Sequence, residues 1–179
     1  MVAIGNFDGV HKGHQAVLAK AAKKAEALNL PLVALTFDPH PKEVLLPEKV
    51  PLRLTPFEEK TDLLSRYGAD VVYVVPFSQA YAQTTAQRFI EQTLAGALRA
   101  AHVVVGADFA FGRHREGDVQ TLEEAGQAHG FTVDALTLEG AGEEAYSSTA
   151  IRQAIAAGDR KKARQMLGHD IARLKETDK

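Results

Sequence analysis

The sequence predicts an α/β fold, with a doubly wound, mostly parallel sheet of five strands and helices on both faces. Two observations predict it. Short runs of β-branched and apolar residues recur along the chain, with helical patterns between them, and these runs are apolar at odd and even positions alike. Strands that are buried on both faces have this second property. Alternation of strands and helices favours parallel pairing.

The predicted strands are short and carry few charges. They cover residues 2–4, 32–37, 71–75, 102–105 and 131–138. The carboxyl ends of parallel strands meet at one edge of a sheet, and ligands bind there, near the point where the strand order reverses. We therefore expect the loops after the first four strands, which follow Ile4, Phe37, Val75 and Val105, to share one edge of the sheet and to form the binding site there.

Six helical segments separate or follow these strands. They cover about 18–28, 55–67, 85–98, 119–129, 149–157 and 159–167. The second begins at Thr55-Pro56-Phe57-Glu58, which predicts a capping box with proline at the first helical position. Before it, residues 38–54 hold four prolines and are predicted to form a long loop. A loop of this length in a compact domain is usually functional.

Composition excludes several classes of protein. The 21 Lys and Arg against 23 Asp and Glu give a formal charge of −2, which argues against nucleic acid or an anionic membrane as a partner. The absence of cysteine excludes disulfides, Cys-ligated zinc and thiolate nucleophiles. No apolar run reaches the roughly 18 residues that span a bilayer. The amino terminus does not resemble a signal peptide, and we expect a cytoplasmic protein.

The first loop carries the clearest chemical signal. Residues 5–14 read Gly-Asn-Phe-Asp-Gly-Val-His-Lys-Gly-His, directly before a helix. Glycines allow close backbone approach to a ligand, and the free N–H groups of a helix start favour an anion. His11 and His14 flank Gly13, where both can donate to phosphate oxygens. The spacing fits neither a Walker A loop nor Gly-x-Gly-x-x-Gly.

A second cluster lies near the carboxyl terminus, at residues 146–152, Tyr-Ser-Ser-Thr-Ala-Ile-Arg. Ser148 or Thr149 is expected to cap the helix that starts here. Arg152 falls in its first turn, where an isolated helix would favour an acidic residue. A cation at this position is understandable if it shares a bound anion with the backbone N–H groups.

These motifs resemble the HxGH nucleotidyltransferase superfamily, and more closely the adenylyltransferase (FAD synthetase) module of bacterial bifunctional riboflavin kinase/FAD synthetases. Five motifs carry the resemblance, and they occur in the same order as in that family over about residues 2–168. They are residues 5–11 with the His-x-Gly-His pattern of residues 11–14, 36–41 (Thr-Phe-Asp-Pro-His-Pro), 106–112 (Gly-Ala-Asp-Phe-Ala-Phe-Gly), 115–118 (Arg-Glu-Gly-Asp) and 147–152.

The resemblance implies a Rossmann-like fold and transfer of AMP from ATP to FMN, giving FAD and pyrophosphate by direct in-line attack. Mg²⁺ is expected to enter with ATP, with no dedicated metal site in the protein. FMN would come from a separate riboflavin kinase, because the kinase domain is expected to be absent from this chain. We expect residues 1–168 to form the adenylyltransferase domain and residues 169–179 a polar tail.

The resemblance also assigns roles to residues of this chain. The expected catalytic residues are His11, His14 and Arg152. The expected ATP-binding residues are Gly5, Asn6, Phe7, Asp8, Gly13, Gly106, Asp108, Ser147, Ser148 and Thr149. The expected FMN-binding residues are Thr36, Asp38, His40, Phe109, Phe111 and Arg115.

Several alternatives stay open at this point. The same phosphate machinery serves nucleotidyltransferases with other phosphate acceptors, and a non-catalytic module that binds ATP or flavin would share many of these residues. Phe109 and Phe111 fit either a stacking or a core position, and Asp38 and His40 also suit a turn. His102, His129 and His169 match no motif and are interpreted as structural or surface residues.

Overall fold

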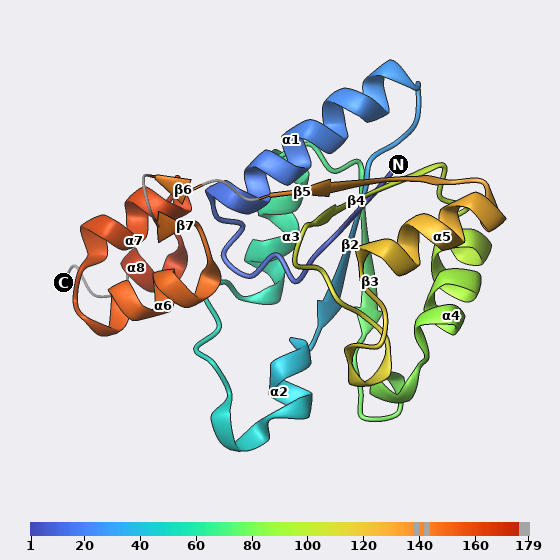
Figure 1. Cartoon of the computed structure of the whole chain (residues 1–179). Helices are drawn as coiled ribbons and strands as arrows, with labels where there is room; N and C mark the ends of the chain where they lie inside the picture. Colours follow the sequence, from blue (N-terminus) through green and yellow to red (C-terminus); the bar gives the residue numbers. More distant parts are fainter. Residues whose placement is uncertain (138–139, 142–143, 176–179) are drawn as a thin grey trace.

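The computed structural model of the chain describes residues 1–137, 140–141 and 144–175 (Figure 1). Its strands are β1 (Val2–Ile4), β2 (Val33–Asp38), β3 (Val71–Pro76), β4 (His102–Gly106), β5 (Thr132–Leu136), β6 (Gly140–Ala141) and β7 (Glu144–Ala145). The α-helices are α1 (Lys12–Ala27), α2 (Pro41–Leu45), α3 (Phe57–Arg66), α4 (Ala86–Phe89), α5 (Val119–His129), α6 (Ser148–Ala156), α7 (Arg160–Leu167) and α8 (Ala172–Lys175). The shorter or irregular helices are η1 (Pro47–Lys49), η2 (Tyr81–Gln83), the π-helix η3 (Ile90–Ala97) and η4 (Arg113–Arg115).

The main sheet has the order β3-β2-β1-β4-β5, and all of its strand pairs are parallel. This confirms the predicted five-stranded α/β fold. The fifth strand ends at Leu136, and Leu138 of the predicted strand lies outside the described residues. The chain moves outward from β1 to β2 and β3, then returns to the other side of β1 with β4. The strand order therefore reverses between β1 and β4, which places a ligand crevice at the carboxyl end of β1.

Both faces of the sheet are covered by helices. Ala3, Ala34 and Val104 belong to a core that includes residues of α1 and α3. Alternate residues on the same strands, such as Ile4 and Val105, belong to a second core with α4, η3 and α5. This arrangement explains the apolar runs without alternation, because each residue in the central strands is buried on one face or the other.

A third core lies among the last helices, which stand beside the amino-terminal end of α1 (Figure 1). It includes Leu54, Ile151, Leu167, Ile171 and Leu174. Ile171 and Leu174 are almost completely buried, although the sequence predicted a polar tail from residue 169. The packed domain therefore extends to at least residue 174, because these two apolar side chains cover α6 and α7.

Three local predictions need correction. The segment 38–54 contains α2 and η1 rather than a bare loop, because Pro41 starts a helical turn that His40 Nδ1 caps by accepting from the Lys42 N–H at 3.1 Å. The predicted helix 85–98 changes from α-helix to π-helix at Ile90. Thr55 does not cap α3, because its hydroxyl accepts a hydrogen bond from the Gly9 N–H at 3.1 Å.

Candidate active site

Two histidines meet where the loop after β1 enters α1. His11 is the residue before the helix and is 2% exposed, and His14 follows within the first turn. Their rings stack with centroids 3.7 Å apart and an angle of 20° between their planes. The Phe7 ring packs edge-on against His14 at 5.2 Å. The stack fixes both imidazoles at the helix N-terminus, where an anion is favoured.

Gly13 lies between these histidines for a steric reason. A Cβ atom at this position would lie 3.2 Å from the His11 ring and 3.2 Å from the Tyr146 carbonyl oxygen. A larger residue would therefore push the His11 ring or the segment before α6. The His-x-Gly-His spacing thus serves the stacking of the rings and the close approach of two distant segments.

Both imidazoles are neutral at neutral pH. Burial lowers the pKa of His11 to about 4, with further contributions from the positive charges of Arg152 and His169. Burial also lowers the pKa of His14 well below its usual value, and His11 and Lys60 act in the same direction. Within the described residues, the buried Nδ1 atoms of both rings have no hydrogen-bond partner. Buried polar atoms are rarely left in this state, and Nε2 of His102 at the amino end of β4 is another instance.

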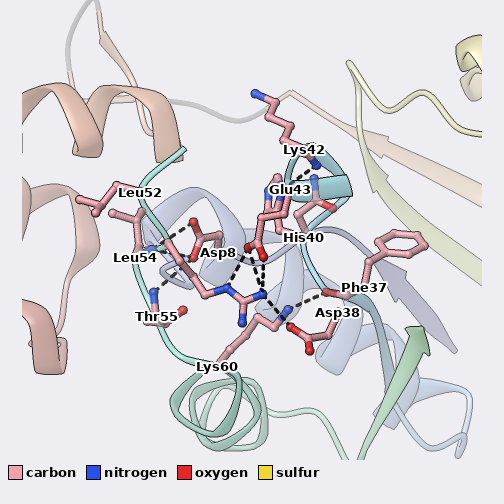
Figure 2. A network of polar contacts seen from close by, with 12 residues as sticks. Asp8, Phe37, Asp38, His40, Lys42, Glu43, Leu52, Leu54, Thr55 and Lys60 are labelled. Atoms are coloured by element: carbon pink, nitrogen blue, oxygen red, sulfur yellow. Dashed lines mark hydrogen bonds and ion pairs between the residues drawn. The ribbon is translucent and has the colours of Figure 1, made fainter. Parts of the chain in front are cut away.

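Asp8 belongs to the same loop and connects it to the segment before α3. Its carboxylate is 5% exposed and accepts hydrogen bonds from the Leu54 and Thr55 N–H groups at 3.0 and 3.2 Å (Figure 2). Arg152 donates to the same carboxylate through Nη2 and to the Leu52 carbonyl through Nε at 2.6 Å. Arg152 is therefore fixed by a buried ion pair that joins the first loop, the segment before α3 and α6.

The start of α6 is hydrogen-bonded to the loop that carries Asp8. Ser147, rather than Ser148 or Thr149, caps the helix by accepting from the Ala150 N–H at 3.1 Å. The Ser148 hydroxyl instead donates to the Asp8 carbonyl at 2.9 Å, and Thr149 is exposed. The starts of α1 and α6 thus lie near each other although they are far apart in the sequence. This is the convergence that the two motifs predicted.

The carboxyl end of β2 borders the histidine site. Thr36 is completely buried and donates to the Asn6 carbonyl at 3.1 Å. Lys60 of α3 donates to Thr36 Oγ1 at 3.2 Å. It also donates to the Phe37 carbonyl at 3.0 Å (Figure 2). Lys60 is only 6% exposed, and burial lowers its pKa. Its contacts connect β2, α3 and the first loop.

A second cation, Arg53, is held between two carboxylates. Its Nη2 atom lies 3.0 Å from Asp38 Oδ1 and its guanidinium also pairs with Glu43 at 3.0 Å. His40 is close enough that Asp8 and Arg152 influence its pKa, which burial lowers. The segment 38–54 therefore folds over the site, and the predicted residues Asp38 and His40 lie at its edge.

The loop after β4 leaves the same edge of the sheet. Gly106 ends β4, and Asp108 and Arg115 are exposed. Phe109 and Phe111 stack with centroids 5.5 Å apart, but Phe111 is 8% exposed and also packs on Phe89. Phe111 therefore lies in the core, with the half-buried Phe109 beside it. Among the described residues, no hydrogen bond, ion pair or ring contact joins this loop to the histidines.

Sequence reasoning missed two residues of the site, Lys60 and Arg53. Lys60 had a detectable signal, because it lies three and four positions before Leu63 and Leu64 on the apolar stripe of α3. A lysine in such a stripe is unusual. Arg53 had no such signal, because its partners Asp38 and Glu43 become its neighbours only when the segment 38–54 folds back.

Comparisons with known proteins agree with this geometry. Residues 1–150 match the family described as FAD synthetase. The chain is 41% identical over 172 residues to the bifunctional riboflavin kinase/FMN adenylyltransferase of Escherichia coli K12, covering 96% of this chain and 55% of that protein. The protein of the same name from Bacillus subtilis is 38% identical over 171 residues, covering 94% of this chain and 53% of that protein.

A solved structure shows the same fold. It is a Streptococcus pneumoniae chain described as a macrolide-efflux protein, with a TM-score of 0.84 and 34% sequence identity. The match covers 96% of this chain and 57% of that chain. Among the helices described here, none is both long and apolar enough to cross a membrane.

The fold and the paired histidines define an α/β protein whose site faces the carboxyl end of a parallel sheet and is suited to phosphate groups. With the match over residues 1–150, the chain belongs to the FAD synthetase family. It spans about half the length of the bifunctional relatives described above.

Proposed function

We propose that this protein transfers the AMP group of ATP to FMN, producing FAD and pyrophosphate. The observation that carries the proposal is the stacked pair of neutral histidines, with unpartnered Nδ1 atoms, at the start of α1 and close to the start of α6. The relatives named as FMN adenylyltransferases support the choice of reaction and acceptor.

The reaction needs positioning and charge stabilisation more than covalent catalysis. An oxygen of the FMN phosphate attacks the α-phosphorus of ATP, and the bond from that phosphorus to the oxygen bridging to the β-phosphate breaks. Pyrophosphate leaves with the electron pair. ATP enters as its Mg²⁺ complex, in which phosphate oxygens and water supply most metal ligands. Among the described residues, no group of three or more acidic or histidine side chains is placed to hold a metal.

Each histidine has a defined part in this proposal. A neutral imidazole carries one N–H, which donates to a phosphate oxygen as negative charge develops on it. Because His11 is buried, His14 is partly buried and the two rings stack, little reorganisation is needed when the substrates bind. Gly5, Asn6, Phe7, Asp8 and Gly13 shape the loop that approaches ATP.

The start of α6 is proposed to hold the leaving pyrophosphate. The free backbone N–H groups of the helix and the guanidinium of Arg152 supply donors, with Ser147, Ser148 and Thr149 at the helix start. Arg152 uses Nε and Nη2 for protein contacts, so further guanidinium N–H groups stay available for phosphate.

The acceptor is proposed to lie along the carboxyl ends of β2 and β4. Thr36, Asp38 and His40 border one side, while Gly106, Asp108, Phe109 and Arg115 border the other, with Phe111 beneath Phe109. FMN would come from a riboflavin kinase activity, which the names of the bifunctional relatives place in their longer chains.

FAD formation from ATP, Mg²⁺ and FMN tests the proposal directly, with riboflavin as a parallel substrate. Product from FMN and none from riboflavin supports an adenylyltransferase. A second panel should replace FMN by nicotinamide mononucleotide and 4′-phosphopantetheine. Product with one of these acceptors and none with FMN would assign the same site to a different nucleotidyl transfer. Flavin or ATP binding without any product would indicate a binding module.

A further inference from the structure

We propose that Lys60 is the counter-ion of the FMN phosphate, and that this buried ammonium lets the site distinguish FMN from riboflavin. The inference rests on the proposed function and adds to it the residue that recognises the phosphate group of FMN. Lys60 belongs to α3 and lies outside all of the motifs that identify the family.

Lys60 is a buried cation that forms no ion pair with any of the described residues. Its side chain is 94% buried, yet its two hydrogen-bond acceptors, Thr36 Oγ1 and the Phe37 carbonyl, are both neutral. Asp38, Asp8 and Glu43 favour its charged form without bonding to it, because Asp38 and Glu43 are paired with Arg53 and Asp8 is paired with Arg152. A buried charge without a directly bonded partner of opposite sign is costly and uncommon. An anionic ligand would remove that cost.

The ammonium group also has a donor to spare. Nζ of a protonated lysine carries three N–H groups, and two are used within the described residues. Figure 2 shows the end of the Lys60 side chain beside the Phe37 carbonyl and Asp38, at the edge of β2. The spare donor is therefore near the strand end along which the acceptor is proposed to bind.

The position of Lys60 relative to the histidines indicates which phosphate it meets. Arg152 is held by the Asp8 carboxylate and the Leu52 carbonyl, whereas Lys60 is held at the carboxyl end of β2 by Thr36 and the Phe37 carbonyl. In agreement with this separation, Arg152 contributes to the lowered pKa of His11 and Lys60 to the lowered pKa of His14. In-line transfer places the attacking and leaving oxygens on opposite sides of the reacting phosphorus. With pyrophosphate at Arg152 and α6, the attacking FMN phosphate belongs at Lys60.

Flavin binding tests this assignment independently of turnover. Dissociation constants for FMN and riboflavin are measured by flavin fluorescence with α,β-methylene-ATP and Mg²⁺ present. Lys60→Met removes the charge and keeps most of the side-chain volume. It should weaken FMN binding about 10- to 100-fold, the range of a charge-assisted hydrogen bond, and leave riboflavin binding within about twofold. Lys60→Arg should keep most of the FMN affinity.

Arg66→Met is the matched control, because it removes one exposed positive charge from the same helix at its far end. It should leave both flavins unaffected. Equal loss of FMN and riboflavin binding in Lys60→Met would assign Lys60 a structural role and overturn the inference. Unchanged FMN binding would overturn it as well.

The wild-type protein gives a test that does not depend on folding of a variant. FMN should bind more tightly than riboflavin, and only FMN affinity should fall as salt concentration rises. Equal affinities would overturn the Lys60 assignment, and if FAD still forms from FMN, the proposed function stands. Absence of both flavin binding and FAD formation would overturn the two proposals together.

Discussion

Histidine side chains lie at both ends of the parallel sheet, but they make different contacts there. At the amino end, His102 Nδ1 lies 2.5 Å from Thr132 Oγ1, and Nε2 lies 3.3 Å from Asp134 Oδ2. At the carboxyl end, His11 and His14 face each other in a stack, and their buried Nδ1 atoms have no partner among the described residues. Burial lowers the pKa of all three.

The difference is one of degree. His102 Nδ1 contacts Thr132 Oγ1 and so joins β4 to β5, although its buried Nε2 makes no hydrogen bond and lies only within ion-pair distance of Asp134. At the carboxyl end, neither stacked ring has a hydrogen-bond partner for Nδ1 among the described residues, and this is the end at which we propose that the substrates bind. Ion pairs follow the same division, since Asp8–Arg152 is buried, whereas the Asp134 and Lys24 side chains are 29% and 37% exposed.

The largest effect is expected from breaking the buried ion pair. Arg152→Ala leaves the Asp8 carboxylate buried without its counter-ion, which should lower the free energy of unfolding by about 3–5 kcal/mol. It should also raise the KM for ATP. Lys24→Ala, at the other end, should cost about 1 kcal/mol or less. Urea unfolding of both variants measures the contrast, and equal losses would contradict it. Adding Asp8→Asn to Arg152→Ala should recover part of the loss.

The next effect concerns catalysis. His14→Ala should lower kcat for FAD formation about 100- to 1,000-fold, because the hydrogen bond to phosphate strengthens in the transition state. FMN affinity should change little. His102→Ala removes a buried histidine ring from the opposite end of the sheet and should leave kcat within about twofold. A rate for His14→Ala within a few-fold of the wild type would remove this histidine from the mechanism.

The stability of the carboxyl end should depend on pH. Because the pKa of folded His11 is about 4 and the unfolded value is about 6.5, the unfolded chain binds the proton first as the pH falls. Stability is therefore complete above about pH 6.5 and declines toward pH 4, by up to about 3 kcal/mol from this residue. Urea unfolding across this range should show a smaller slope for His11→Asn. An unchanged slope would assign the acid sensitivity to other groups.

A smaller effect than those at the carboxyl end is expected at His102. His102→Ala should lower the free energy of unfolding by about 1–2 kcal/mol, because Thr132 and Asp134 lose a partner but keep access to water. The same loss should appear with and without ATP, because the site lies at the end of the sheet away from the substrates. A loss that ATP reverses would link the two ends and contradict the division between them.

Local patterns predicted most of the fold. The strands could be recognised because residues such as Val103, Val104 and Val105 must be apolar when helices cover both faces. Turn residues were harder to interpret. Thr55 has the sequence of a helix cap, yet its hydroxyl bonds Gly9, 46 residues away. Ile171 and Leu174 lie in a polar context, so their burial depends on helices that the local pattern does not reveal.

The histidine site was predictable because its residues lie within ten positions of one another. Contacts between distant segments were not. The sequence indicated Arg152 as a cation near a helix start, but its ion-pair partner Asp8 is 144 residues away and could not be inferred from local pattern. The pairing of Arg53 with Asp38 and Glu43 depends on the course of the segment 38–54. Such contacts follow from tertiary packing, which periodicity and capping rules do not describe.

Hydrogen bonds join the loop after β1 and the start of α1 to the end of α7 and the residues that follow it, and these bonds have a consequence for synthesis on the ribosome. Gly9 receives a hydrogen bond from His169, 160 residues later, and Gln15 donates to the Leu167 carbonyl, 152 residues later. The residues that bear the paired imidazoles are made before β2, β3, β4 and β5, but these bonding partners are made after all four strands. The nascent chain therefore completes this loop only after the sheet beneath it has been made.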